Sequence, residues 1–167
     1  MLPIVLKETA VKVGLAGAGE ALERRRAALI EAGVTPVVVP LGGSPDLDGL
    51  KLLYVAGIAR LQAAKIVAQA RATGVLVNVE DIPDLCDFHA PATVRRGDLL
   101  VTVSTGGRVP GLAKLLREWL SARLGSEWSR YLDAVSDRRA QWRGEGLSPP
   151  DVSQRVREYV SARDWLS

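Results

Sequence analysis

A short apolar segment that ends in a glycine turn and leads into a helical pattern constrains the fold of this chain most strongly. Val11–Leu15 predicts a strand, Ala16–Gly19 a turn, and Glu20–Ala32 a helix with apolar residues at helical spacing. Gly33 suits the left-handed residue that ends a helix, and Val37–Val39 then predicts a second buried strand. The order strand, turn, helix, strand is a β-α-β unit, which joins parallel strands.

The same alternation continues along the chain. After a loop at Pro40–Leu50, the predicted elements are strands at Leu52–Ala56, Val75–Val79 and Leu99–Ser104, an extended segment at Ala92–Val94, and a helix at Ala59–Thr73. Short strands alternating with helices are typical of an α/β fold with a Rossmann-like, doubly wound parallel sheet. We therefore expect an α/β domain over residues 1–112.

The remainder of the chain predicts helices. Pro110–Leu124 and Ser126–Arg143 are amphipathic, and Ser148–Asp151 is a start signal for a third helix that ends near Trp165. Three of the four tryptophans lie beyond residue 120, so the two parts of the chain differ in composition. We expect residues 113–167 to form a helical dimerisation segment, with Trp and Leu side chains facing a second copy.

Composition narrows the class of protein. With 47% apolar residues among 167, the chain can bury a core and is not disordered. No apolar run approaches the roughly 20 residues that span a bilayer, so no membrane association is expected. The single cysteine, Cys86, permits no internal disulfide, which favours a cytoplasmic location. Arg24–Arg26 follow Glu20 and Glu23 by one helical turn, which predicts a solvated face and no nucleic-acid partner.

The glycine turn has two interpretations. Gly17 and Gly19 would let the backbone approach a pyrophosphate, while the following helix directs its free N–H groups at that anion. The alternative is a purely structural turn. Leu22 stands where the usual dinucleotide fingerprint has a third small residue, and no acidic residue closes the strand at Val39-Pro40. The residues alone leave both interpretations open.

A second polar cluster, Asn78–Pro83, follows a buried strand at the edge where open α/β sheets bind ligands. The carboxylate of Asp81 could act there as a base, or it could cap the turn at Ile82-Pro83. Cys86 and His89 have the spacing of a metal-ligand pair. Two ligands do not make a closed site, and we expect no metal.

A third cluster, Ser104–Pro110, is a hydroxyl- and glycine-rich loop that leads into a helix N-terminus. With Arg108 and Lys114 beside it, the loop could bind an anionic group. The alternative is an ordinary connection in which Ser104 or Thr105 satisfies backbone donors.

Short motifs in a fixed order run along nearly the whole chain. They are Leu2-Pro3-Ile4, Gly17-Ala18-Gly19-Glu20, Glu31-Ala32-Gly33, Asn78-Val79-Glu80-Asp81, Phe88-His89-Ala90-Pro91-Ala92, Arg96-Gly97, Ser104-Thr105-Gly106-Gly107 and Pro110-Gly111-Leu112-Ala113. In this order they resemble the precorrin-2 dehydrogenase and sirohydrochlorin ferrochelatase family, the first module of siroheme synthases. The resemblance implies NAD-dependent oxidation of precorrin-2 to sirohydrochlorin by a homodimer, in some members with ferrochelation to siroheme.

The resemblance also implies roles for residues. Asp81 falls on the family's catalytic aspartate, a general base or proton acceptor. The implied cofactor-binding residues are Gly17, Ala18, Gly19, Glu20, Ala21, Leu41, Gly42 and Gly57. The implied substrate-binding residues are Asn78, Ser104, Thr105, Gly106, Gly107 and Arg108. Arg95, Arg96, Arg108 or Lys114 could neutralise the substrate's carboxylates by charge-assisted hydrogen bonds.

Two departures from the family pattern leave alternatives. Residues 41–50 are shorter than usual and lack the segment for an edge strand, and Gly57-Ile58-Ala59-Arg60 replaces the family's Ala-Thr-Asp. An alternative function is therefore a non-catalytic tetrapyrrole or nucleotide binder with a degraded NAD site. A third hypothesis, based on Arg138, Arg139 and Arg143, is a basic interaction module, although acidic residues interleave with these arginines.

Overall fold

The chain forms two compact units in the structure, a computed structural model that describes residues 1–43 and 45–166. The first unit is Met1–Ala90, and the second begins at Pro91. This division lies earlier in the chain than the boundary that the sequence predicts near residue 112. The reason is that the segment after Pro91 forms a hairpin that packs against the helix following it.

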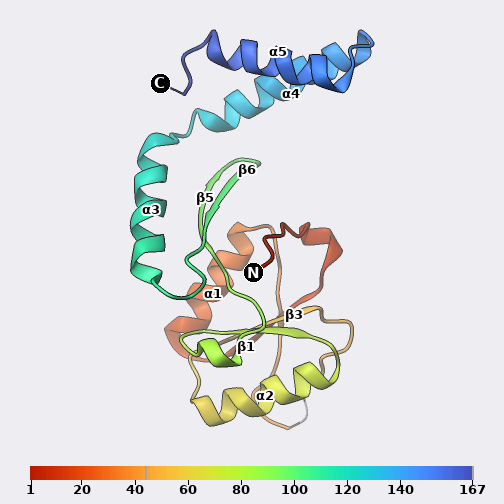
Figure 1. The fold of residues 1–167 in the computed structure, drawn as a ribbon. Helices are drawn as coiled ribbons and strands as arrows, with labels where there is room; N and C mark the ends of the chain where they lie inside the picture. Colours follow the sequence, from red (N-terminus) through yellow and green to blue (C-terminus); the bar gives the residue numbers. More distant parts are fainter. Residues whose placement is uncertain (44, 167) are drawn as a thin grey trace. The chain divides into compact units, whose positions relative to one another are not determined.

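The first unit is built on a four-stranded parallel sheet (Figure 1). Its strands are β1 (Val13–Gly17), β2 (Val37–Val38), β3 (Leu52–Ala56) and β4 (Leu76–Val79), in the order β2-β1-β3-β4. A short 3-10 turn, η1 (Glu8–Ala10), precedes β1. The sheet confirms the predicted Rossmann-like fold without one edge strand.

Two helices cover the sheet. α1 (Gly19–Glu31) connects β1 to β2, and α2 (Arg60–Ala72) connects β3 to β4. These two connections run in opposite directions across the sheet, so right-handed crossovers place α1 and α2 on opposite faces (Figure 1). Because both faces are covered, the central strands are continuous apolar runs. The largest fully buried side chains are Leu15, Leu53, Val55, Val67, Val75 and Val77.

The strand at the β2 edge differs from the prediction. The sequence predicts a buried strand at Val37–Val39, but β2 has two residues, and Val37 and Val38 are 41% and 55% exposed. Only Val39 is buried. Within the described residues β2 pairs with β1 alone, so its outer side has no neighbouring strand to cover it.

The second unit contains an antiparallel hairpin and three helices. Strands β5 (Ala92–Arg96) and β6 (Leu99–Val103) form a separate two-stranded sheet, followed by α3 (Pro110–Arg123), α4 (Trp128–Gly144) and α5 (Pro149–Ser161). The Arg96 guanidinium donates to the carbonyl oxygens of Leu124, at 2.6 Å, and Ser121, at 3.0 Å. A cation at these carbonyls stabilises the C-terminal end of α3.

Aromatic side chains join α4 to the C-terminal segment. The rings of Tyr131 and Trp165 stack with centroids 4.0 Å apart, and those of Trp142 and Tyr159 meet edge to face at 6.1 Å. The Arg163 guanidinium lies 3.4 Å from the centre of the Tyr159 ring. Trp142 and Trp165 therefore contact aromatic rings of their own chain. The predicted contact of Trp side chains with a second copy remains a prediction. None of the helices in the described part of the chain has the length and apolar character needed to cross a membrane.

Candidate functional site

The carboxyl ends of the strands bring the predicted site residues of the first unit to one edge of the sheet. β1, β3 and β4 end at Gly17, Ala56 and Val79. The amide of Ala18 donates to Ala56 O at 3.1 Å, and the amide of Glu80 donates to Val55 O at 2.9 Å. The direction of the connections reverses between β1 and β3, so this edge contains the switch point at which open α/β sheets bind ligands.

Two glycines at this edge are required by close packing. A Cβ added to Gly17, whose φ is 147°, would lie 1.9 Å from Ala56 O. A Cβ added to Gly57, whose φ is 69°, would lie 2.1 Å from Ala18 O. The two turns therefore pack backbone against backbone, which explains the need for glycine at position 17, and a contact of Gly17 with the cofactor remains a prediction.

Gly19 differs from both of these glycines. Its φ is 67°, and a Cβ added to it would meet nothing within 4 Å. It is the first residue of α1, and the preceding residue, Ala18, is extended and provides no side-chain cap for the helix. The open space and the uncapped helix N-terminus fit a phosphate group, which would accept hydrogen bonds from the backbone.

The other predicted cofactor residues lie in different surroundings. Ala21 is next to Gly57, since a Cβ added to that glycine would lie 3.3 Å from the Cβ of Ala21. Glu20 is exposed, and its Oε2 lies 3.9 Å from Arg24 Nη1. Leu41 packs against the hydrophobic core, while a Cβ added to Gly42 would meet nothing within 4 Å. The structure therefore brings Gly17, Ala18, Gly19, Ala21 and Gly57 together. The cofactor-binding roles of these residues, and of Glu20, Leu41 and Gly42, remain predictions.

Asp81 lies in the turn that follows β4. Its φ is 59°, a left-handed conformation that non-glycine residues rarely adopt, and its side chain is exposed. The amide of Ile82 donates to Val79 O at 3.4 Å and closes the turn. Non-glycine residues in this conformation often occur at functional sites, where the surrounding structure holds them. The catalytic role of Asp81 remains a prediction.

An ion pair that the sequence pattern does not reveal lies next to Asp81. Arg24 Nη2 of α1 lies 3.5 Å from Glu80 Oε1, which joins α1 to the end of β4. Among the residues that the structure describes, the second carboxylate oxygen of Glu80 is buried and has no hydrogen-bond partner. Arg26 Nε lies 3.3 Å from Glu23 Oε2, an ion pair that the helical spacing predicts.

Asn78, predicted to bind substrate, is buried in β4. Its side-chain nitrogen donates to the carbonyl oxygen of Phe88 at 2.8 Å and lies 3.7 Å from Cys86 Sγ. The sulfur of Cys86 accepts from the amide of Val79 and donates to its carbonyl, both at 3.2 Å. These contacts hold the chain after Asp81 against β4. A direct contact between Asn78 and substrate remains a prediction.

The predicted substrate loop lies in the second unit, between β6 and α3. The Ser104 hydroxyl accepts from the amide of Gly106 at 3.2 Å, and the Thr105 hydroxyl bonds to both the amide and the carbonyl of Val109. Gly106 and Gly107 have φ values of 68° and 74°. The hydroxyls therefore satisfy local backbone groups, as the alternative interpretation of this loop predicts.

The arginines proposed to bind substrate carboxylates are not equivalent. The Arg96 side chain donates to Leu124 O, Arg95 O and both oxygens of Ser121, so most of its N–H donors are already used within the protein. Arg108 is exposed. Arg108 therefore remains a candidate for binding an anion, whereas Arg96 stabilises the second unit.

Two groups in the first unit have shifted pKa values. A hydrogen bond from Arg60 lowers the pKa of Asp84, and the same contact raises the pKa of Arg60. Burial raises the pKa of Tyr54, although the nearby Arg25 acts in the opposite direction. Both shifts favour the states ordinarily present at neutral pH, a charged ion pair and a neutral phenol.

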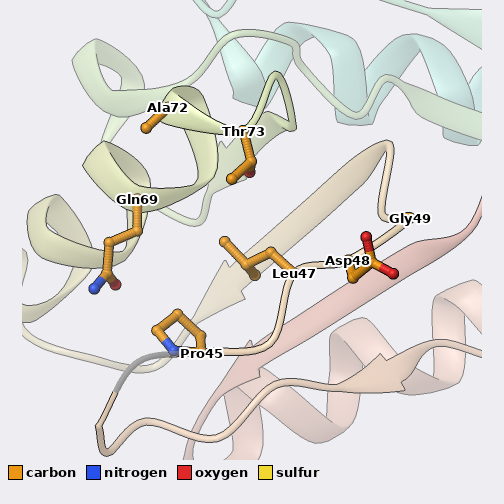
Figure 2. Close-up of a pocket in the computed structure, with 7 residues that line it drawn as sticks. All are labelled: Pro45, Leu47, Asp48, Gly49, Gln69, Ala72 and Thr73. Carbon is orange, nitrogen blue, oxygen red and sulfur yellow. The ribbon is translucent and has the colours of Figure 1, made fainter.

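A surface depression in the first unit lies away from these residues. It is lined by Pro45, Leu47, Asp48, Gly49, Gln69, Ala72 and Thr73 (Figure 2). Gly49 precedes β3, and Thr73 follows α2 and precedes β4, so the depression lies at the edge where these strands begin. Ligands of parallel α/β sheets bind at the opposite edge, so we do not assign the depression a function.

Comparisons with known proteins indicate the type of cofactor and the type of fold. Residues 40–92 match a family described as NAD(P)-binding. This range contains β3, α2, β4 and Asp81, but not the glycine turn at residues 17–19. A solved structure of SirC, a precorrin-2 dehydrogenase, has a TM-score of 0.76 and 22% identity, covering 100% of this chain and 93% of that chain. It shows the shared fold.

Siroheme synthases are similar in sequence. The enzyme of Methylococcus capsulatus is 31% identical over 163 residues, which cover 85% of this chain and 34% of that protein. The enzyme of Azotobacter vinelandii is 34% identical over 175 residues, which cover 92% of this chain and 37% of that protein. The chain spans about a third of the length of these curated relatives.

The residues at the sheet edge fit the cofactor that these comparisons indicate, which is NAD. The open space at Gly19 and the uncapped start of α1 are suited to a pyrophosphate. The sequence matches extend over most of the chain, and the structural match covers all of it. By sequence, the chain belongs to the siroheme synthase family, and it shares its fold with SirC.

Proposed function

We propose that this protein oxidises precorrin-2 to sirohydrochlorin in siroheme biosynthesis. One observation carries the proposal: an open glycine position at the start of α1 and an exposed, left-handed Asp81 follow strands of the same parallel sheet, at its carboxyl edge. The first is suited to a dinucleotide and the second to proton transfer. The sequence similarity to siroheme synthases supports this substrate class.

The oxidation removes a hydride and a proton from the substrate. When bound, NAD supplies the hydride acceptor. The backbone at Ala18 and Gly19 binds the pyrophosphate and thereby orients the cofactor against the sheet edge. The carboxylate of Asp81 accepts the proton. Ferrochelation, which the resemblance implies for some members, would use the same carboxylate. It can be measured as siroheme formation when ferrous iron is added to the protein and sirohydrochlorin.

Cofactor binding can be tested by calorimetric titration with NAD. We expect wild-type protein to bind NAD, and we expect Gly19→Asp to weaken binding at least about 100-fold, because a carboxylate would fill the open space and repel the pyrophosphate. Gly74→Asp is the matched control. Gly74 also has a positive φ and open space, but it follows α2 at the other edge of the sheet. Equal binding by wild type and Gly19→Asp would contradict the assignment.

The non-catalytic alternative is supported by residues 57–60, at the carboxyl end of β3. They lack the hydroxyl and the carboxylate of the family's Ala-Thr-Asp, two groups that the resemblance places near the cofactor. A protein of this kind would bind sirohydrochlorin without measurable affinity for NAD, so the same titration separates the two functions.

We also propose that the protein is a homodimer. Leu112, Leu115, Leu116 and Trp119 recur at helical spacing on α3 and are between 41% and 64% exposed. Light scattering should give twice the chain mass of 17.9 kDa. Leu115→Glu should shift the protein towards the monomer, whereas Leu61→Glu, at an exposed leucine of α2, should not. A wild-type mass equal to one chain would contradict the proposal.

A further inference from the structure

The segment after β4 folds back along the free edge of the sheet. We call residues 80–88 the Asp81 loop. The amide of Asp87 donates to Val77 O at 2.7 Å, and the amide of Val77 donates to Asp87 Oδ2 at 2.9 Å. Because β4 is the last strand in the sheet order, these bonds satisfy backbone groups that would otherwise lack a strand partner. The C-terminal part of the loop is therefore fixed to β4.

Two arginines at opposite ends of α2 bind the Asp81 loop. Arg71, in the last turn, donates from Nε to Asp87 Oδ1 at 3.0 Å and from Nη2 to Leu85 O at 3.2 Å. Arg60, the first residue of the helix, makes a bidentate ion pair with Asp84. Its Nη1 lies 2.9 Å from Asp84 Oδ1, and its Nη2 bonds to the second oxygen. A bidentate arginine–carboxylate pair fixes orientation as well as distance.

The two pairs fix different parts of the loop. Asp87 is bonded to the β4 backbone as well as to Arg71, so that pair secures the return of the chain along the strand. Asp84 lies in the short 3-10 turn η2 (Pro83–Leu85), three residues after Asp81. The Arg60 pair therefore acts on the part of the loop nearest to Asp81, whose left-handed backbone must be held by its neighbours.

We propose that Arg60 and Asp84 are positioning residues: their ion pair joins the start of α2 to the Asp81 loop and holds the Asp81 carboxylate in the orientation that proton transfer requires. The inference rests on the function proposed above. Arg60 and Asp84 are 62% and 59% exposed, and exposed ion pairs add little to stability. Loss of the pair should therefore leave the fold intact and change the geometry of the loop.

The test compares Arg60→Met, Asp84→Asn and the charge-reversed double variant Arg60→Asp/Asp84→Arg. Each single variant should lower kcat about 10- to 100-fold, the cost of a small misplacement of a catalytic group, and leave the KM for NAD unchanged. The double variant should recover most of the lost kcat, because the two charges can pair again. Arg155→Met is the matched control, since Arg155 and Glu158 of α5 form an ion pair of similar exposure.

Amide hydrogen exchange of residues 80–88 gives a second readout that does not need turnover. Exchange should be faster in both single variants and return towards wild type in the double variant. If wild-type protein does not turn over precorrin-2, the proposed function fails, and this readout still tests the positioning contact. Single variants with wild-type kcat and wild-type exchange would overturn the inference, as would a double variant that recovers neither.

Discussion

Replacing Asp81 with asparagine is expected to lower kcat about 10²- to 10⁴-fold, the usual contribution of a general base. An amide cannot accept the proton, yet it matches the carboxylate in size. Asparagine also tolerates the left-handed conformation that Asp81 adopts, at a φ of 59°, so the turn should keep its shape. The change should therefore appear in the rate of NADH formation with precorrin-2, while calorimetry should show unchanged NAD affinity.

Glu80→Gln is the control for this substitution. Glu80 is the adjacent carboxylate, but it is half-buried and lies beside Arg24. We expect the kcat of the Glu80→Gln variant to stay within a few-fold of the wild-type value. The opposite pattern, in which Glu80→Gln is inactive and Asp81→Asn is not, would assign the proton acceptor to Glu80 and contradict the role proposed for Asp81.

Gly17→Ala is expected to lower the free energy of unfolding by about 3 kcal/mol, the upper part of the usual range for overpacking. The added Cβ would lie 1.9 Å from Ala56 O, and that oxygen is fixed because it accepts from the amide of Ala18. Since β1 and β3 are paired along their length, the clash cannot be relieved by moving one side chain. Urea unfolding followed by circular dichroism measures the effect.

Gly74→Ala separates the clash from the backbone conformation. Gly74 also has a positive φ, 74°, but a Cβ there would meet nothing within 4 Å. We expect a loss of about 1 kcal/mol, which is the cost of placing a side chain in the left-handed region. A loss as large as that of Gly17→Ala would show that conformation, and not contact with β3, explains the requirement for glycine at position 17.

Much of the fold is predictable because buried strands of a parallel sheet are continuous apolar runs. The strand predicted at Leu52–Ala56 has the same bounds as β3. Each helix of the second unit begins within two residues of its predicted first residue. The strand predicted at Val37–Val39 forms, but its predicted burial is wrong for Val37 and Val38. Their apolar run indicates a buried strand, whereas the described residues of the short segment 41–50 supply no further strand to cover them.

The site is predictable only in part. The sequence places Gly17 and Gly19 in one turn, but it cannot show that Gly17 packs against β3 while Gly19 faces open space. The pairs Arg24–Glu80 and Arg60–Asp84 join residues 56 and 24 positions apart. Helical spacing reveals pairs within one turn, such as Glu23–Arg26, and gives no sign of pairs formed by tertiary packing.

The decisive experiment for the proposed dehydrogenase activity is incubation of the purified protein with precorrin-2 and NAD, with NADH and sirohydrochlorin followed together. We expect one NADH for each sirohydrochlorin formed, at a rate that is proportional to protein concentration and strongly reduced in both Asp81→Asn and Gly19→Asp. Absence of NADH formation by protein that binds sirohydrochlorin would contradict the proposed activity and would establish a tetrapyrrole binder without dehydrogenase activity.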